Sequence, residues 1–221
     1  MKVIIFGATG MVGQGALNAC LRDREVSQVL LVGRTASGRM EPRIKEWVTS
    51  DLFDLGGRAA DLSGYDACFF CLGVSSSGMD EARYTRITHD LTLSVAGTLC
   101  RLNPGMTFIY LSGAGADSTE NSRTMWTRVR GRTENELRRL PFKAVYVFRP
   151  GIIQPLDGIR SKTSSYRLFY SAIGPLLTPL RRLIPKVILT TDGMGRAMIA
   201  AARRGAPKAV LEAADIYALT T

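Results

Sequence analysis

The sequence predicts an α/β fold built on a parallel sheet of about seven strands. Short β-branched apolar runs recur along the 221 residues and alternate with stretches of helical periodicity. A turn containing three glycines joins the first apolar run to the first helix. The chain is 46% hydrophobic and 22% charged, which suits a single soluble domain of 24.1 kDa. Alternation of this kind is typical of a doubly wound sheet with right-handed crossovers.

The glycine turn predicts an anion-binding site near the N-terminus of the chain. The expected strand at residues 2–6 runs directly into this turn, and a helix follows over residues 16–21. Glycines let the backbone approach a ligand closely, and the first N–H groups of a helix attract anions. The context indicates a Rossmann-like site for a dinucleotide pyrophosphate, although a tight turn without a ligand is the alternative. The expected contacts are Gly7, Thr9, Gly10, Met11, Val12 and Gly13.

The end of the second strand predicts which dinucleotide is bound. This strand is expected over residues 27–33 and ends at Arg34, with Arg39 close by. A site for NAD usually has a carboxylate there, bonded to the ribose 2′-hydroxyl. A guanidinium suits a 2′-phosphate instead, so NADP(H) is preferred over NAD(H). The alternative is that Arg34 is a solvated turn residue.

Third and fourth strands are expected over residues 44–49 and 67–71. Cys68 and Cys71 have the spacing of a CxxC motif, but positions three apart in a strand face opposite sides of a sheet. We therefore interpret both as core residues, since a redox pair should open a helix and a zinc site needs more ligands. His89 is the only histidine, so a histidine-based metal site is not expected, and no metal is predicted.

The later elements continue the alternation. A long helix is expected over residues 80–102, because apolar side chains repeat there at near-helical spacing. The loop at residues 113–117 would lie at the carboxyl end of the fifth strand, where open α/β sheets place their ligands. A fifth strand is expected over residues 106–112, a helix over 123–140 and a sixth strand over 143–148. A helix capped by Thr191 is expected over residues 191–199, and a last strand over 209–211.

One stretch near the C-terminus differs from the rest. Residues 158–191 contain no Asp or Glu, and prolines 175, 179 and 185 argue against a continuous helix. We predict short helices and loops that form a substrate-side cap over residues 152–190, embedded in a single domain of residues 1–221. A cationic, apolar segment could also contact anionic lipid, although peripheral membrane contact is the less favoured interpretation.

The charge balance bears on partners and location. The net charge is +10, but most arginines are dispersed and no basic helix with interleaved aromatics is present. A dinucleotide phosphate site explains the cations more specifically than nucleic-acid binding, and no specific nucleic acid is expected. No apolar run could span a bilayer, and the first residues form a strand rather than a signal peptide. These features predict a cytoplasmic location, and the four cysteines agree with a reducing compartment.

Several motifs in order indicate a family. The glycine turn has the form Gly-x-x-Gly-x-x-Gly, and the later motifs are Cys71-Leu72-Gly73, Leu111-Ser112-x-x-Gly115-Ala116-Asp117, Arg130-Gly131-x-x-Glu134 and Phe148-Arg149-Pro150-Gly151. With these motifs the chain resembles the atypical short-chain dehydrogenase/reductases, in the branch that includes the Tat-interacting oxidoreductase and epimerase/dehydratase-like proteins. The resemblance implies a nicotinamide dinucleotide, contacted also by Cys71, Leu72, Gly73, Arg130 and Pro150.

The same resemblance implies an adenine contact. The pair Asp51-Leu52 matches the family's Asp-Leu pair, whose carboxylate meets the adenine amino group. Asp54 is a rival for this role, because the spacing Asp-x-x-Asp leaves the register open.

The chain departs from the family at the catalytic positions. Ser112 matches the family's serine, but Trp126 and Arg130 stand where the family has Tyr-x-x-x-Lys. An indole cannot give up a proton near neutral pH, and a guanidinium stays charged. We expect Arg130 to bind cofactor ribose or phosphate, Ser112 to orient a carbonyl and Trp126 to pack or to stack on substrate. The candidate proton donors are Tyr84, Tyr166, Tyr170, His89 and water.

Two functions remain open from the sequence. The first is an NADP(H)-dependent oxidoreductase acting on an unknown small carbonyl-type substrate with a non-standard proton donor. The second is a catalytically inactive NADP(H)-binding regulator or scaffold that engages a protein partner. The glycine turn and Arg34 support both, whereas the missing tyrosine favours the second.

Overall fold

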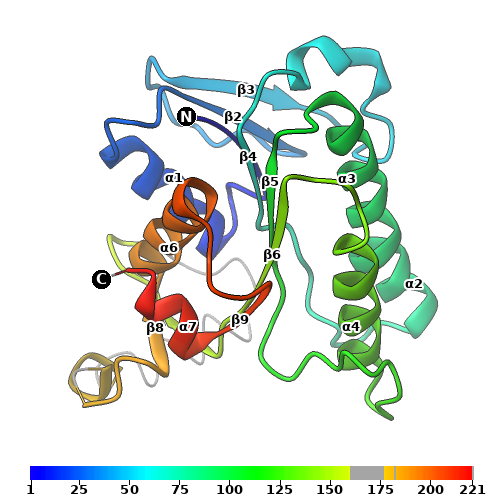
Figure 1. Cartoon of the computed structure of the whole chain (residues 1–221), viewed down its shortest axis with the longest axis vertical. Coiled ribbons are helices and arrows are strands. Elements are labelled where there is room, and N and C mark those ends of the chain that lie inside the picture. Colours follow the sequence, from blue (N-terminus) through cyan, green and yellow to red (C-terminus); the bar gives the residue numbers. More distant parts are fainter. Residues whose placement is uncertain (160–176, 182, 221) are drawn as a thin grey trace.

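A parallel sheet of seven strands forms the centre of the protein (Figure 1). The computed structural model describes residues 1–159, 177–181 and 183–220. The strand order is β3-β2-β1-β4-β5-β6-β9, and every pairing is parallel. This confirms the predicted Rossmann-like fold class. The bounds are β1 Lys2–Phe6, β2 Gln28–Gly33, β3 Ile44–Val48, β4 Ala67–Phe70, β5 Thr107–Leu111, β6 Ala144–Arg149 and β9 Val210–Glu212.

Helices cover both faces of the sheet (Figure 1). On one face lie α1 (Met11–Arg22), α6 (Thr191–Arg204) and α7 (Ala213–Ala218), and on the other lie α2 (Glu81–Thr85), α3 (Leu91–Leu102) and α4 (Met125–Leu137). The long helix predicted over residues 80–102 consists of α2, a π-helical turn at Arg86–Asp90 and α3. In the part of the chain that the structure describes, no helix is long and apolar enough to cross a membrane.

The strands separate two apolar cores. Alternate side chains point to opposite faces, so Ile5 packs with the α1 and α6 side while Ile4 packs with the α3 side. Cys68 and Cys71 follow the same rule: they lie in different cores and both are buried. Burial raises the pKa of Cys71 to about 12, which keeps its thiol protonated and unreactive. The prediction that these cysteines are core residues is confirmed.

The strand order reverses beside β1. The chain proceeds outward from β1 through β2 to β3, and then returns to place β4 on the other side of β1. In open α/β sheets a crevice forms at such a reversal, outside the carboxyl ends of the strands. The glycine turn after β1 and the chain after β4 therefore meet at this crevice.

Two short strands were not among the predicted elements. β7 (Ile152–Gln154) pairs in parallel with β8 (Ile188–Thr190) outside the main sheet.

The helix that follows β8 is capped by the Thr190 side chain, so the prediction that Thr191 is the cap was wrong by one residue. The hydroxyl of Thr191 instead accepts a hydrogen bond from the backbone N–H of Leu156 at 3.1 Å. Much of the predicted cap, residues 160–176 and 182, lies outside the described residues.

Glycines allow α1 and α6 to pack closely. A Cβ atom on Gly195 of α6 would lie 2.6 Å from the Ala19 Cβ and 2.7 Å from the Gly15 carbonyl oxygen of α1. A Cβ on Gly15 would lie 2.3 Å from the Thr191 carbonyl oxygen. The two helix backbones are therefore too close for any side chain at these positions, and this packing holds α1 behind the glycine turn.

We predict that Gly195→Ala destabilises the fold. The added methyl has no space between α1 and α6, and overpacking of this kind costs about 1–3 kcal/mol. Gly97→Ala is the matched control, because Gly97 lies in α3 and its Cβ would meet only the Arg101 Nη1 at 3.8 Å. That control should raise stability by about 0.5–1 kcal/mol through helix propensity. Urea unfolding of the variants measures both effects, and equal stability of the two variants would contradict the prediction.

Candidate functional site

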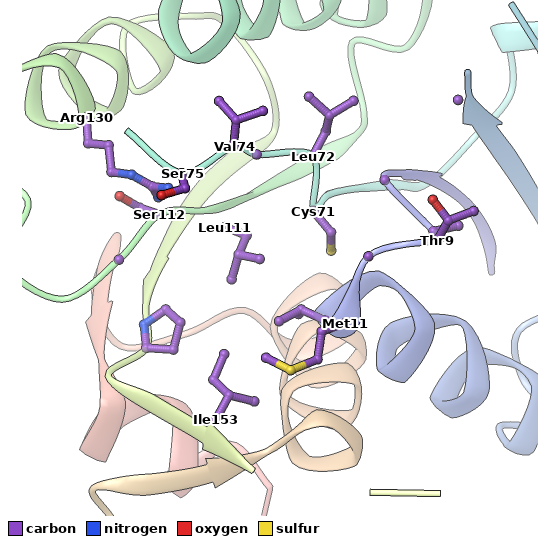
Figure 2. A pocket seen from close by; sticks show the side chains of 18 of the residues that line it. Thr9, Met11, Cys71, Leu72, Val74, Ser75, Leu111, Ser112, Arg130 and Ile153 are labelled. Atoms are coloured by element: carbon purple, nitrogen blue, oxygen red, sulfur yellow. The ribbon is translucent and has the colours of Figure 1, made fainter. Parts of the chain in front are cut away.

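A cleft of about 970 Å³ opens at the carboxyl ends of the central strands (Figure 2). Its floor is the glycine turn, where Gly7 has a φ of +78° and its carbonyl accepts from the Gly10 N–H at 2.9 Å. Most predicted contacts line the cleft, namely Gly7, Thr9, Gly10, Met11, Val12, Arg34, Cys71, Leu72, Gly73, Ser112, Trp126, Arg130 and Pro150.

The glycines of the turn have separate roles. A Cβ on Gly7 would lie 2.7 Å from the Leu72 backbone nitrogen, so only glycine lets the turn approach the end of β4. A Cβ on Gly13 would lie 2.1 Å from the Gly7 carbonyl oxygen. The lack of a side chain at Gly13 therefore lets α1 pack directly against the turn. Gly13 itself does not line the cleft. No side chain caps α1 at Gly10, which leaves its first N–H groups available to an anion.

One end of the cleft carries the arginine predicted to select the cofactor. Arg34 is exposed there, and it has no ion-pair partner among residues 1–159, 177–181 and 183–220. Glu46 of β3 also lines this end, and its Oε1 accepts from the Ser37 N–H at 2.7 Å. Sequence reasoning missed Glu46, because it lies beside Lys45 in a strand of mixed polarity and has no distinctive pattern. The hydrogen bond between Ser37 and Glu46 holds the loop between β2 and β3, and Arg34 lies at the start of this loop.

Three residues near this end do not line the cleft. Arg39 donates from Nη2 to the Asn18 Oδ1 at 3.0 Å. Leu52 is buried in the core on the α3 side, and the Asp51 Oδ1 accepts from the Phe53 N–H at 2.8 Å. The adenine contact of Asp51 and Leu52 thus stays a prediction.

The other end of the cleft is mostly apolar, and among the described residues Arg130 is the cation that lines it. Leu72, Val74, Leu111, Met11 and Ile153 surround this space (Figure 2). Sequence reasoning did not identify Val74 or Ile153, because Val74 lies in an irregular segment and Ile153 belongs to the unpredicted strand β7. Arg130 reaches in from α4, and its guanidinium points toward the same part of the cleft as the hydroxyls of Ser75 and Ser112 (Figure 2).

A buried network holds Ser112. The Ser112 hydroxyl donates to Glu134, which is only 1% exposed, and Arg149 binds both carboxylate oxygens of Glu134 through Nε at 3.1 Å. Burial alone would lower the pKa of Arg149, but its bonds to Glu134 and Glu212 raise it. Because the single hydroxyl proton of Ser112 is directed to Glu134, Ser112 could donate to a substrate carbonyl only after breaking this bond.

Trp126 and Arg130 lie on the face of α4 that fronts the cleft. The Trp126 ring packs beside Gly115, whose Cβ would lie 3.4 Å from the indole Cη2. Arg130 donates from Nε to the Tyr84 hydroxyl oxygen at 3.0 Å. Tyr84 is a buried residue of α2 and also lines the cleft. The structure therefore brings together an arginine and a tyrosine that are far apart in the sequence.

The other candidate proton donors lie elsewhere. His89 packs away from the cleft, with Nδ1 2.7 Å from Asp90 Oδ1 and Nε2 3.1 Å from Glu136 Oε1. Tyr166 and Tyr170 lie outside the described residues. Of the protein groups considered as donors, Tyr84 is the one that the described structure places at the cleft.

Comparison with curated proteins finds distant relatives. The chain is 30% identical over 155 residues to Protein HTATIP2 of Rattus norvegicus, covering 69% of this chain and 62% of that protein. It is 26% identical over 188 residues to the mitochondrial Protein fmp52 of Emericella nidulans, covering 81% of this chain and 79% of that protein. The chain thus spans less than two thirds of the rat protein. No protein-family model matches the chain.

Solved structures share the fold over nearly the whole chain. The Bordetella bronchiseptica enzyme WbmF in complex with NAD+ has a TM-score of 0.68 at 16% identity, covering 99% of this chain and 76% of that one. A short-chain dehydrogenase/reductase from Saccharomyces cerevisiae has a TM-score of 0.68 at 14% identity, covering 99% of this chain and 97% of that one.

The strand order and the cleft define a Rossmann-like fold, with a cleft at the position where such folds bind dinucleotides. The similarity to Protein HTATIP2 and to the fmp52 protein supports the resemblance to atypical short-chain dehydrogenase/reductases that the motifs predicted, and the solved structures share the fold.

We predict that Glu134→Gln destabilises the protein by about 3 kcal/mol. The change leaves the largely buried guanidinium of Arg149 without its main counter-charge, and breaking a buried ion pair is costly. Glu81→Gln is the control, because Glu81 forms a more exposed pair with Arg128 at 2.6 Å and should cost less than about 1 kcal/mol. Chemical denaturation gives the comparison. Similar losses in the two variants would show that the Ser112–Glu134–Arg149 network contributes no special stability.

Proposed function

We propose that the protein binds NADP(H) and reduces a small carbonyl compound. The observation that carries this proposal is the continuity of the cleft, which joins the uncapped start of α1 to Arg34 at one end and to Arg130 at the other. A pyrophosphate fits the α1 end, because unpaired N–H groups and the helix dipole favour anions. The fold likeness to WbmF, which was solved with NAD+, supports a nicotinamide dinucleotide in this position.

The preference for NADP(H) rests on Arg34. Its guanidinium is exposed at the cleft and lacks a counter-charge among the described residues, so it is free to meet a 2′-phosphate. Glu46 is the neighbouring carboxylate, but one of its oxygens accepts from the Ser37 N–H. That bond supports a bracing role for Glu46 rather than the ribose-binding role of the acidic residue in NAD sites.

We expect Arg34→Ala to weaken NADPH binding about 10- to 100-fold, since hydrogen bonds to charged groups contribute about 1.5–3 kcal/mol. The affinity for NADH should change by less than about twofold, because NADH lacks the 2′-phosphate. Fluorescence titration of each nucleotide measures both constants. Arg39→Ala serves as the matched control, because Arg39 lies close in sequence but binds Asn18. Equal weakening of NADPH and NADH by Arg34→Ala would refute the 2′-phosphate role.

The reductive chemistry must work without the family's tyrosine. A bound nicotinamide would supply the hydride, and the residues of this chain would orient the substrate and stabilise the charge that develops on its oxygen. Arg130 can offer N–H groups to that oxygen, and the Trp126 indole N–H can donate one more hydrogen bond. The proton would come from Tyr84 or from water in the cleft. Loss of nicotinamide absorbance across a panel of carbonyl compounds tests this activity.

A second function, an inactive NADP(H)-binding regulator or scaffold, is favoured by specific observations. Trp126 cannot act as a general acid, and the Ser112 proton is directed to Glu134. Such a protein would keep the nucleotide site and engage a protein partner through its surface. Tight NADPH binding without turnover of any carbonyl in the panel would favour this second function. The cytoplasmic location stays a proposal under either function.

A further inference from the structure

Arg130 forms no ion pair with any residue that the structure describes. Its Nε donates to Tyr84, and the N–H groups of Nη1 and Nη2 have no hydrogen-bond or ion-pair partner among residues 1–159, 177–181 and 183–220. Glu134 is an acidic residue on the same helix, but it is already bound by Arg149 and Ser112. The guanidinium therefore has free donors at the apolar end of the cleft.

The neighbouring tyrosines do not neutralise this charge. Burial raises the pKa of Tyr110 to about 12, so its phenol stays uncharged at neutral pH. Tyr84 accepts a hydrogen bond from Nε through its hydroxyl oxygen and brings no carboxylate. Burial alone would lower the pKa of Arg130, but its surroundings, which include the Tyr84 hydrogen bond and the nearby charge of Glu134, raise it. The guanidinium therefore stays charged and can attract an anion that enters the cleft.

The geometry keeps the free N–H groups accessible. The guanidinium lies between the ends of β4 and β5, where a Cβ on Gly73 would be 4.0 Å from Nη2 and a Cβ on Gly113 would be 3.7 Å from Nη1. The absence of side chains at both glycines leaves space in front of the guanidinium. Because Tyr84 occupies only Nε, the Nη1 and Nη2 pair can bind a carboxylate through parallel hydrogen bonds.

We propose that Arg130, held in place by Tyr84, is the receptor for a substrate carboxylate, so that the substrate class of this site is an oxo acid with an apolar remainder. This inference rests on the proposed NADP(H) function. Met11, Leu111 and Ile153 lie on one side of the cleft and form the apolar surface that would receive the rest of the molecule (Figure 2). Tyr84 is a positioning residue in this arrangement, since it acts through the guanidinium.

The test compares an anionic probe with its neutral analogue. The full chain is first saturated with NADP+, which cannot reduce the probes, and the complex is then titrated with phenylglyoxylate or phenylglyoxylamide by calorimetry. The two probes have nearly the same shape and differ in the carboxylate. We expect phenylglyoxylate to bind at least about tenfold more tightly, because a charge-assisted pair contributes about 1.5–3 kcal/mol. Equal affinities, or no binding of either probe, would overturn the inference.

Variants assign the preference to particular groups. Arg130→Gln should abolish the preference for the anion, and a preference that persists in this variant would overturn the inference. Tyr84→Phe should reduce the preference about three- to tenfold, because the guanidinium loses the hydrogen bond that orients it. Tyr110→Phe is the matched control, since it removes the same atom from a neighbouring buried tyrosine that does not bond to Arg130 in the described structure, and it should leave the preference unchanged.

The design separates two kinds of failure. Absence of NADP(H) binding to the unaltered protein would overturn both the proposed function and this inference. Normal NADP(H) binding without discrimination between the probes would overturn only the inference. If Arg130→Gln itself loses NADP(H), the comparison of Tyr84→Phe with Tyr110→Phe decides the outcome. Equal effects of those two variants would then count against the role of Tyr84 and Arg130.

Discussion

The close contact between the backbones of Gly7 and Gly13 determines where the binding site can lie. Because neither residue has a Cβ, α1 begins directly against the turn after β1, and that turn touches the first residues after β4. A methyl group at either position would clash with backbone atoms and force these segments apart. The uncapped N–H groups of α1, the end of β2 with Arg34 and the end of β4 are placed relative to one another by this contact.

Local patterns explain why most of the fold could be predicted. Apolar runs such as those of β1 and β5 are buried on both faces, and the helices carry periodic apolar residues, so each element is recognisable within its own sequence. β7 and β8 could not be predicted in this way. Each comprises only three residues, and their pairing depends on segments that are separated by more than thirty residues of chain. The predicted boundary at Thr191 failed for a similar reason, since either of two adjacent threonines could have served as the cap.

Site residues could be predicted where their position at the end of a strand indicates their role. They could be predicted less well where the role depends on a partner that is distant in the sequence. The glycine turn and Arg34 follow from position along the strands. In contrast, the motifs that contain Ser112, Glu134 and Arg149 are individually weak in the sequence, and only the folded chain shows that they form one buried network. The bond between Tyr84 and Arg130 joins α2 to α4 and has no sequence signature at all. Ion pairs and hydrogen bonds across long stretches of chain carry no periodicity, which is why spacing alone does not reveal them.

At the positions where the family resemblance implies Tyr and Lys, α4 has Trp126 and Arg130, and this difference changes the chemistry available on the face of α4 that fronts the cleft. A tyrosine beside a lysine can release a proton, because the cation stabilises the phenolate. An indole beside a guanidinium cannot release one, but both groups donate hydrogen bonds, and the guanidinium binds planar anions through two parallel bonds. Tyr84 holds Nε from α2, which directs the remaining donors of Arg130 toward the cleft. The described residues thus keep the cleft of a Rossmann-like fold, and on the face of α4 that fronts it they place donor groups suited to recognising charge.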